Sequence, residues 1–307
     1  MPSQCRDGWL LAVLVLVSVP SLYAQTTRSN AGRKKPAATS KANADTPVIQ
    51  VTHHEDVDGW RVAETSHFRL FHQHLRPLAE AVLRTAERTR GAQQRKWFGV
   101  AGANWDTKCR ICLYPSGEAY SQATGAPGNT AGGHTDIQLD AGRVLSRTIH
   151  LHGDRDDLLL GVLPHEVTHA ILAGHFGGER VPRWADEGMA ILAETPSRIE
   201  MHLRYLPRWR ADELLFRMGD LIRMRDYPEP RAIGAFYAQS VSLVDFLTHE
   251  KGAERFAAFV RDGERDSYTA SLRRHYGWSF AELDRRWKTY AFHSEKPADI
   301  TTTGGGG

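Results

Sequence analysis

The chain has 307 residues, of which 41% are hydrophobic and 24% are charged, and its formal net charge is +3. That apolar content is enough for one substantial core, and it disfavours a membrane protein or a disordered protein as the class of the whole chain. The basic excess lies in the first 47 residues, and the remainder is close to neutral. A nucleic-acid partner is therefore not expected, whereas the basic segment favours contact with an anionic envelope surface.

Residues 1–24 have the pattern of a secretory signal peptide. Arg6 precedes an apolar run from Trp9 to Val17, and the small residue Ala24 offers a cleavage point. The run is shorter than the roughly 20 apolar residues that span a bilayer, and an uncleaved anchor is the alternative. Residues 25–47 lack apolar periodicity and are expected to form a disordered basic linker. The protein is accordingly expected to be periplasmic or extracellular.

Residues 48–293 are expected to form one α+β domain, followed by a solvated tail over residues 294–307. The first half is predicted to be rich in strands, at residues 67–72, 109–114, 135–139 and 144–152, with a helix over residues 77–97 and a loop over residues 125–133. The second half is predicted to be helical, over residues 156–176, 183–194, 197–210, 232–250, 253–261, 267–275 and 279–292. A cleft is expected between the two halves.

Cys109 and Cys112 are the cysteines that would remain after signal cleavage. They fall in a predicted strand, where residues three apart point to opposite faces, so a disulfide between them is poorly placed. Two buried thiols are expected, and a redox pair or half of a metal site is the alternative.

The motif with the clearest chemistry is His165-Glu166-Val167-Thr168-His169. On a helix, residues four apart lie on one face, so both imidazoles can bind one metal ion. Glu166 then projects beside the ion without ligating it, and can take a proton from a zinc-bound water as general base. Apolar residues on both sides place this helix in the core. The motif predicts one catalytic zinc ion, provided that a third ligand exists.

Two residues are candidates for the third ligand. His175 stands six residues after His169, which is the spacing of the HExxHxxGxxH zinc peptidases. Those proteins break the helix with a glycine where this chain has Leu172, and in an unbroken helix His175 would face away from His169. Glu187 follows a turn at Gly177 and Gly178 and lies on the next predicted helix. A His, His, Glu set with an open fourth position is typical of catalytic zinc, so Glu187 is favoured and His175 is the alternative.

Around Glu187 the sequence resembles a known family. The segment Trp-Ala-Asp-Glu-Gly-Met-Ala, residues 184–190, is similar to the Trp-x-x-Glu-Gly-x-Ala segment that follows HExxH in gluzincins. These include the aminopeptidase N-like enzymes and the bacterial peptidase MA-like domains, and Leu-Pro-His-Glu-Val-Thr-His is typical of the latter. A further segment, residues 236–247, is similar to their Tyr-Ala-Gln-Ser helix, and the resemblance covers roughly residues 67–292.

The resemblance implies a thermolysin-like zincin fold, one zinc ion held by His165, His169 and Glu187, and hydrolysis of peptide bonds. It also implies that Tyr237 donates a hydrogen bond to the oxyanion, whereas the alternative for Tyr237 is packing in the core. The chain departs from the family in two respects. It lacks the Gly-x-Met-Glu-Asn segment that binds a free substrate amine, and it has Ile191 where thermolysin-like enzymes orient a zinc histidine with aspartate. The partner that orients His165 is therefore left open.

The remaining histidines include two pairs spaced by two residues, His72 with His74 and His150 with His152. Each pair would share a strand face and could bind metal, although solvated or hydrogen-bonded histidines are the more common case. The sequence therefore predicts a secreted zinc metallopeptidase with a peptide or protein substrate. A non-catalytic envelope module that keeps the same scaffold for binding is the alternative, and the oligomeric state stays open.

Overall fold

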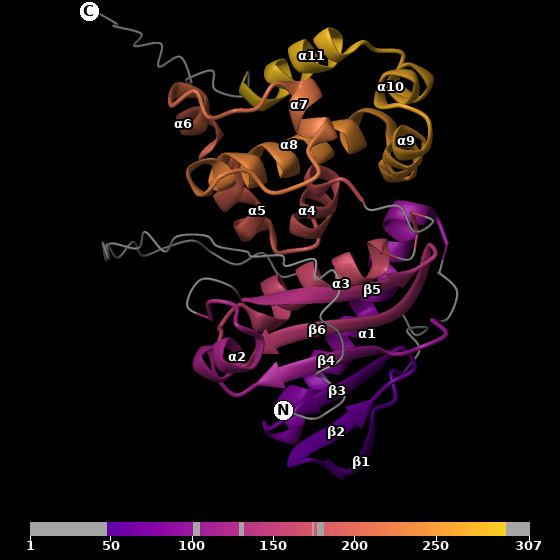
Figure 1. Ribbon diagram of the computed structural model, residues 1–307, viewed down its shortest axis with the longest axis vertical. Helices are drawn as coiled ribbons and strands as arrows, with labels where there is room; N and C mark the ends of the chain where they lie inside the picture. Colours follow the sequence, from indigo (N-terminus) through magenta and orange to yellow (C-terminus); the bar gives the residue numbers. More distant parts are fainter. Residues whose placement is uncertain (1–47, 101–104, 129–131, 174, 177–180, 293–307) are drawn as a thin grey trace, which may run out of the picture.

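The protein is described by a computed structural model over residues 48–100, 105–128, 132–173, 175–176 and 181–292. It is a mixed α+β structure with a strand-rich N-terminal half and a helical C-terminal half (Figure 1). This confirms the predicted division into two halves. The predicted signal peptide, the linker and the tail from residue 294 lie outside the described residues.

Six strands form one mixed sheet in the order β1-β2-β3-β4-β6-β5. Strands β1 to β3 form an antiparallel meander, β3, β4 and β6 run parallel, and the edge strand β5 pairs antiparallel with β6. The strands are β1 (Thr52–Val57), β2 (Trp60–Glu64), β3 (Phe68–His72), β4 (Cys109–Tyr114), β5 (Gly133–Asp140) and β6 (Arg143–His152).

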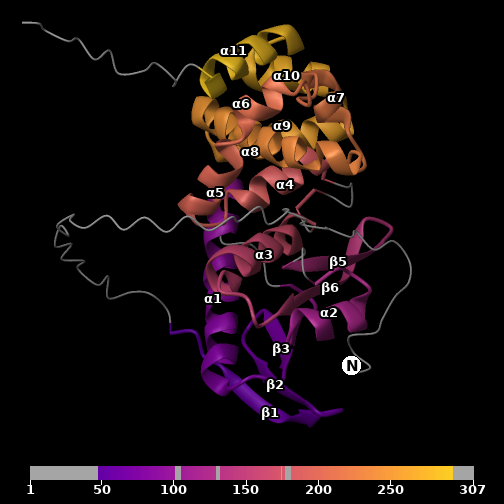
Figure 2. The same cartoon turned by 90° about the vertical axis from the view of Figure 1, so that its left-hand side faces the viewer.

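The two faces of the sheet are covered by different helices (Figure 2). Helices α1 (Arg76–Phe98) and α3 (Leu163–Leu172) pack on one face, where Leu83 and Val167 join the strand residues Ile111 and Ile149 in one apolar cluster. The short helix α2 (Gly117–Thr124) packs on the other face. Helix α3 therefore lies on one face of the sheet, and a separate cluster that contains Trp60, Tyr114 and Tyr120 lies on the other face.

Strand β4 shows how alternation assigns side chains to these faces. Cys109 belongs to the cluster beneath α1 and α3, whereas Cys112 belongs to the cluster beneath α2. Residues three apart thus point to opposite faces, as expected, and Cys109 is a free thiol whose pKa burial raises to about 12. The expectation of two buried thiols is correct for Cys109 and wrong for Cys112, which is disulfide-bonded, and the two cysteines do not form a redox pair with each other.

The C-terminal half packs its helices around a core that contains Trp184, Phe236, Phe256 and Trp287. Helix α8 is buried along most of its length and lies at the centre of this half. The helices are α4 (Arg183–Ile191), α5 (Pro196–Leu203), α6 (Leu206–Ala211), α7 (Met218–Arg223), α8 (Ile233–Lys251), α9 (Ala253–Arg265), α10 (Tyr268–Tyr276) and α11 (Phe280–Phe292), with a 3-10 turn η3 (Pro230–Ala232) before α8.

Several predicted elements differ from those observed. The helix predicted over residues 156–176 is a π-helical segment η2 (Leu158–Val162) followed by α3, which ends at Leu172. The helix predicted over residues 197–210 is divided into α5 and α6, because Pro207 starts a new helix. Strands β1 and β2 and helices α2 and α7 were not predicted. Among the described residues, no helix is both long and apolar enough to cross a membrane.

Candidate metal centre

His165 and His169 lie one turn apart on α3, at the junction of the two halves. Pro164 occupies the first turn of α3, directly after the π-helical segment η2. Every residue of α3 is buried, and the two imidazole rings lie 4.8 Å apart between centroids. The helix thus holds both rings together in the interior, as the spacing of the motif predicts.

Glu187 reaches the same point from α4. Its Oε2 lies 3.4 Å from Nε2 of His165 and 3.8 Å from Nε2 of His169. Among the described residues, these three atoms are buried and have no ordinary hydrogen-bond partner. Unpaired buried polar atoms are costly, and two imidazole nitrogens with one carboxylate oxygen are a donor set suited to zinc. The three side chains therefore fit one metal ion.

A glycine next to Glu187 brings α4 close to α8. A Cβ atom at Gly188 would lie 2.8 Å from the backbone oxygen of Ser240, which is closer than packed atoms tolerate. The Glu-Gly dipeptide thus combines a buried carboxylate with close packing against the helix that carries Tyr237.

Two acidic residues orient the histidines through their second ring nitrogens. Nδ1 of His165 lies 2.8 Å from Oε1 of Glu194, and Nδ1 of His169 lies 2.8 Å from Oδ1 of Asp186. When each Nδ1–H donates to its carboxylate, each Nε2 keeps a lone pair directed at the point shared with Glu187. Glu194 thus fills the orienting role for which the sequence had offered no residue.

The carboxylates also favour the protonated form of the histidines at this site. Burial by itself lowers the pKa of His165, but Glu187 and Glu194 outweigh burial and keep this pKa well above its usual range. Burial raises the pKa of Glu187, but the rings of His169 and His165 bring it down to about 2. The pocket is therefore built to hold positive charge between anionic groups, and a metal ion would displace the imidazolium protons.

Glu166 lies beside the three residues and contacts the sheet. Thr135 of β5 donates a hydrogen bond from Oγ1 to Oε2 of Glu166 at 2.7 Å. The other oxygen, Oε1, is buried and unpaired among the described residues. Burial raises the pKa of Glu166, so this carboxyl group accepts a proton more readily than an exposed one.

Two tyrosines complete the surroundings of Glu187. The hydroxyl of Tyr227 donates to Oε1 of Glu187, and the guanidinium of Arg183 lies 4.8 Å from the centroid of the Tyr227 ring. Tyr237 is buried on α8, with its ring 6.4 Å from that of Tyr227. Burial and the carboxylates of Glu187 and Glu166 raise the pKa of Tyr237. Its hydroxyl therefore stays protonated and keeps a hydrogen to donate.

His175 is not part of the group formed by His165, His169 and Glu187. Although α3 ends at Leu172, the His175 ring stacks on Phe98 at 3.8 Å between centroids. Burial lowers the pKa of His175 to about 4. The prediction of a continuous helix was wrong, but the expectation that His175 faces elsewhere agrees with the geometry.

Sequence reasoning missed four residues around this site: Thr135, Asp186, Glu194 and Tyr227. Glu194 lies three residues beyond the end of α4 at Ile191, so its approach to His165 does not follow from a helical repeat that starts at Glu187. Asp186 stands next to Glu187 within the quoted motif. Thr135 and Tyr227 reach the site only through tertiary contacts and carry no local signal.

No protein-family model matches the chain, and no curated protein matches it in sequence. A similar solved structure is an M1 zinc metallopeptidase from Deinococcus radiodurans, a variant bound to a Tyr-Ser-Ala substrate. That chain is 14% identical with a TM-score of 0.35, and the match covers 81% of this chain and 53% of that chain. The protein described here thus spans about half the length of this neighbour, and the interpretation of its site rests on its own residues.

Proposed function

We propose that the chain is a zinc-dependent peptidase of the gluzincin type, with His165, His169 and Glu187 as metal ligands. The observation that carries the proposal is the convergence of three buried donor atoms beside Oε1 of Glu166, all four without a hydrogen-bond partner in the part of the chain that the structure describes. A binding site for zinc alone has no use for a buried carboxylate that does not ligate, whereas hydrolysis needs such a group as a base.

A zinc ion held there would act as a Lewis acid on the scissile carbonyl and would bring the pKa of a coordinated water towards about 7. Glu166 takes a proton from the attacking water at Oε1 and later delivers that proton to the leaving amine. Thr135 keeps Oε2 occupied, so that Oε1 is the oxygen left for this transfer. Tyr237 donates a hydrogen bond from its hydroxyl to the carbonyl oxygen as negative charge develops there, a contribution of about 3 kcal/mol.

The zincin fold is part of the same proposal. It is supported by the order of the elements: the edge strand β5, then α3 with both histidines, then α4 with the glutamate. Export through the predicted signal peptide and contact of the basic linker with an anionic surface also belong to the proposal. We propose a peptide or protein as the substrate and no nucleic acid.

The experiment is cleavage of a mixed peptide library by the purified, zinc-loaded chain, read by mass spectrometry. We expect peptide-bond cleavage that a chelator abolishes and added zinc restores. A chain that binds zinc at the three residues but cleaves no peptide would favour the alternative, a non-catalytic module.

A further inference from the structure

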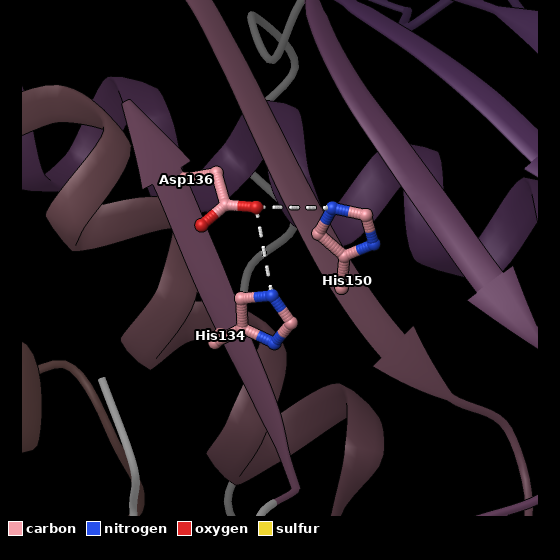
Figure 3. Close-up of side chains that lie close together, drawn as sticks. All are labelled: His134, Asp136 and His150. Atoms are coloured by element: carbon pink, nitrogen blue, oxygen red, sulfur yellow. Dashed lines mark ion pairs between the residues drawn. The ribbon is translucent and has the colours of Figure 1, made fainter. Parts of the chain in front are cut away.

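A second group of metal-ligating side chains lies on the other face of the same sheet. His134 and Asp136 come from β5 and His150 from β6, and their side chains point toward one another (Figure 3). His134 and His150 are direct cross-strand partners, and Asp136 lies two residues along the strand from His134. The rings are therefore neighbours because of the backbone pairing and not because of a flexible loop.

The spacing of this group matches that of the first one. Oδ2 of Asp136 lies 3.6 Å from Nε2 of His134 and 3.5 Å from Nε2 of His150. These separations exceed an ordinary hydrogen bond of about 2.9 Å, but they are close to the roughly 3.4 Å between two ligands of one tetrahedral zinc ion. The corresponding separations around Glu187 are 3.4 and 3.8 Å.

Each histidine of the second group is also oriented through its other nitrogen. Nδ1 of His134 lies 2.6 Å from the hydroxyl of Tyr120, and Nδ1 of His150 lies 3.0 Å from the hydroxyl of Tyr114. With Nδ1–H donated to the tyrosine oxygen, Nε2 keeps its lone pair for a ligand. Both rings are buried, at 4% exposure each.

Asp136 has one carboxylate oxygen that lacks a partner in the described part of the chain and a side chain that is partly exposed to solvent. Its Oδ1 is buried and has no hydrogen-bond partner among the described residues. Its side chain is 36% exposed, so an ion can reach the group from solvent. The two rings stack in parallel at 4.7 Å, and an ion shared by both requires them to tilt about their Nδ1 contacts.

We propose that His134, Asp136 and His150 bind a second divalent transition-metal ion, with zinc as the preferred ion because of the imidazole and carboxylate ligands. The bound ion would link the edge strand β5 to β6, because its ligands come from both strands. Thr135 lies between the two β5 ligands and points to the opposite face, where it holds Glu166. The second ion would therefore stabilise the strand that positions the candidate base, without itself contacting that base.

The test is the zinc content of the purified full chain after equilibrium dialysis, together with zinc-edge anomalous diffraction. The wild type should hold two equivalents and show two anomalous peaks, one between each set of ligands. Asp136→Asn should retain one equivalent, and Glu187→Ala should retain the one at the second site. His152→Gln is the matched control, because His152 is an equally buried histidine on β6 that pairs with Asp154 instead. It should keep two equivalents.

The proposal is overturned if the folded wild type shows no anomalous peak between His134, Asp136 and His150, or if Asp136→Asn keeps two equivalents. Should Asp136→Asn fail to fold, as judged by circular dichroism, the wild-type diffraction decides alone. A wild type that shows the peak at Asp136 but none at Glu187 would contradict the proposed function and leave this inference intact.

Discussion

Thr135 of the edge strand and Glu166 of the HExxH helix are joined by a hydrogen bond of 2.7 Å in the interior of the protein. The same hydroxyl lies 3.1 Å from the backbone oxygen of Glu166. The strand therefore fixes one carboxylate oxygen of the candidate base and leaves the other without a partner among the described residues.

Thr135→Val should lower kcat about tenfold, because it removes a hydrogen bond to a charged group while preserving the shape of the side chain. Steady-state peptide cleavage at saturating zinc measures the effect. The control is Thr148→Val, a buried threonine of β6 that accepts from Arg110. Equal activity of Thr135→Val and the wild type would remove Thr135 from the positioning of Glu166.

Glu194→Gln should weaken zinc binding about 10- to 100-fold, because it removes the anionic partner of Nδ1 of His165. Asp186→Asn should act in the same direction through His169. Competition with a chromophoric chelator measures the affinity. Unchanged affinity in both variants would show that the carboxylates do not orient the metal ligands.

The two tyrosines near Glu187 are expected to differ in their effects. Tyr237→Phe should reduce kcat about a hundredfold with little change in KM or zinc content, because the hydroxyl acts only as the transition state forms. Tyr227→Phe should instead weaken zinc binding about tenfold, because its hydroxyl contacts Glu187. The reverse pattern would assign the oxyanion contact to Tyr227.

His72 should make the stability of the protein depend on pH. The ring is fully buried, and burial lowers its pKa from 6.5 to about 4, so the unfolded chain binds the proton more readily. The contribution is complete above about pH 6.5 and is lost as the pH falls towards about 4, by on the order of 1–2 kcal/mol. Urea unfolding at several pH values measures it, and His72→Gln should flatten the dependence in this window. An unchanged slope would contradict this prediction.

The parts of the site that the sequence predicted are local in the chain. The i, i+4 spacing of His165 and His169 places them on one helical face, and the next helix, α4, returns Glu187 to them. Glu194 was not predicted because it stands three residues beyond Ile191, outside α4, and meets His165 only through the tertiary fold. Helix α2 was missed although Ser116 caps its start and Gly125 its end, because its eight residues carry little apolar periodicity.

The second histidine group could not be found by counting from the turn between β5 and β6. Asp140 pairs with Arg143 next to that turn, and an unbroken register would place His134 opposite Ile149, on the face of α3. A register shift between Gln138 and Leu139 moves the pairing by one residue and brings His134 opposite His150. A bulge of this kind depends on the folded sheet, and the sequence gives no sign of it.

The account rests most directly on the role of Glu166, and the decisive measurement is peptide cleavage by zinc-loaded Glu166→Gln alongside its zinc content. The glutamine keeps the size of the side chain and its contact with Thr135 but cannot accept the proton. We predict that cleavage falls by at least about a hundredfold while zinc stays bound, because Glu166 is a base and not a ligand. Full cleavage by this variant would reject the mechanism, and loss of zinc with loss of cleavage would show that Glu166 belongs to the ligand set.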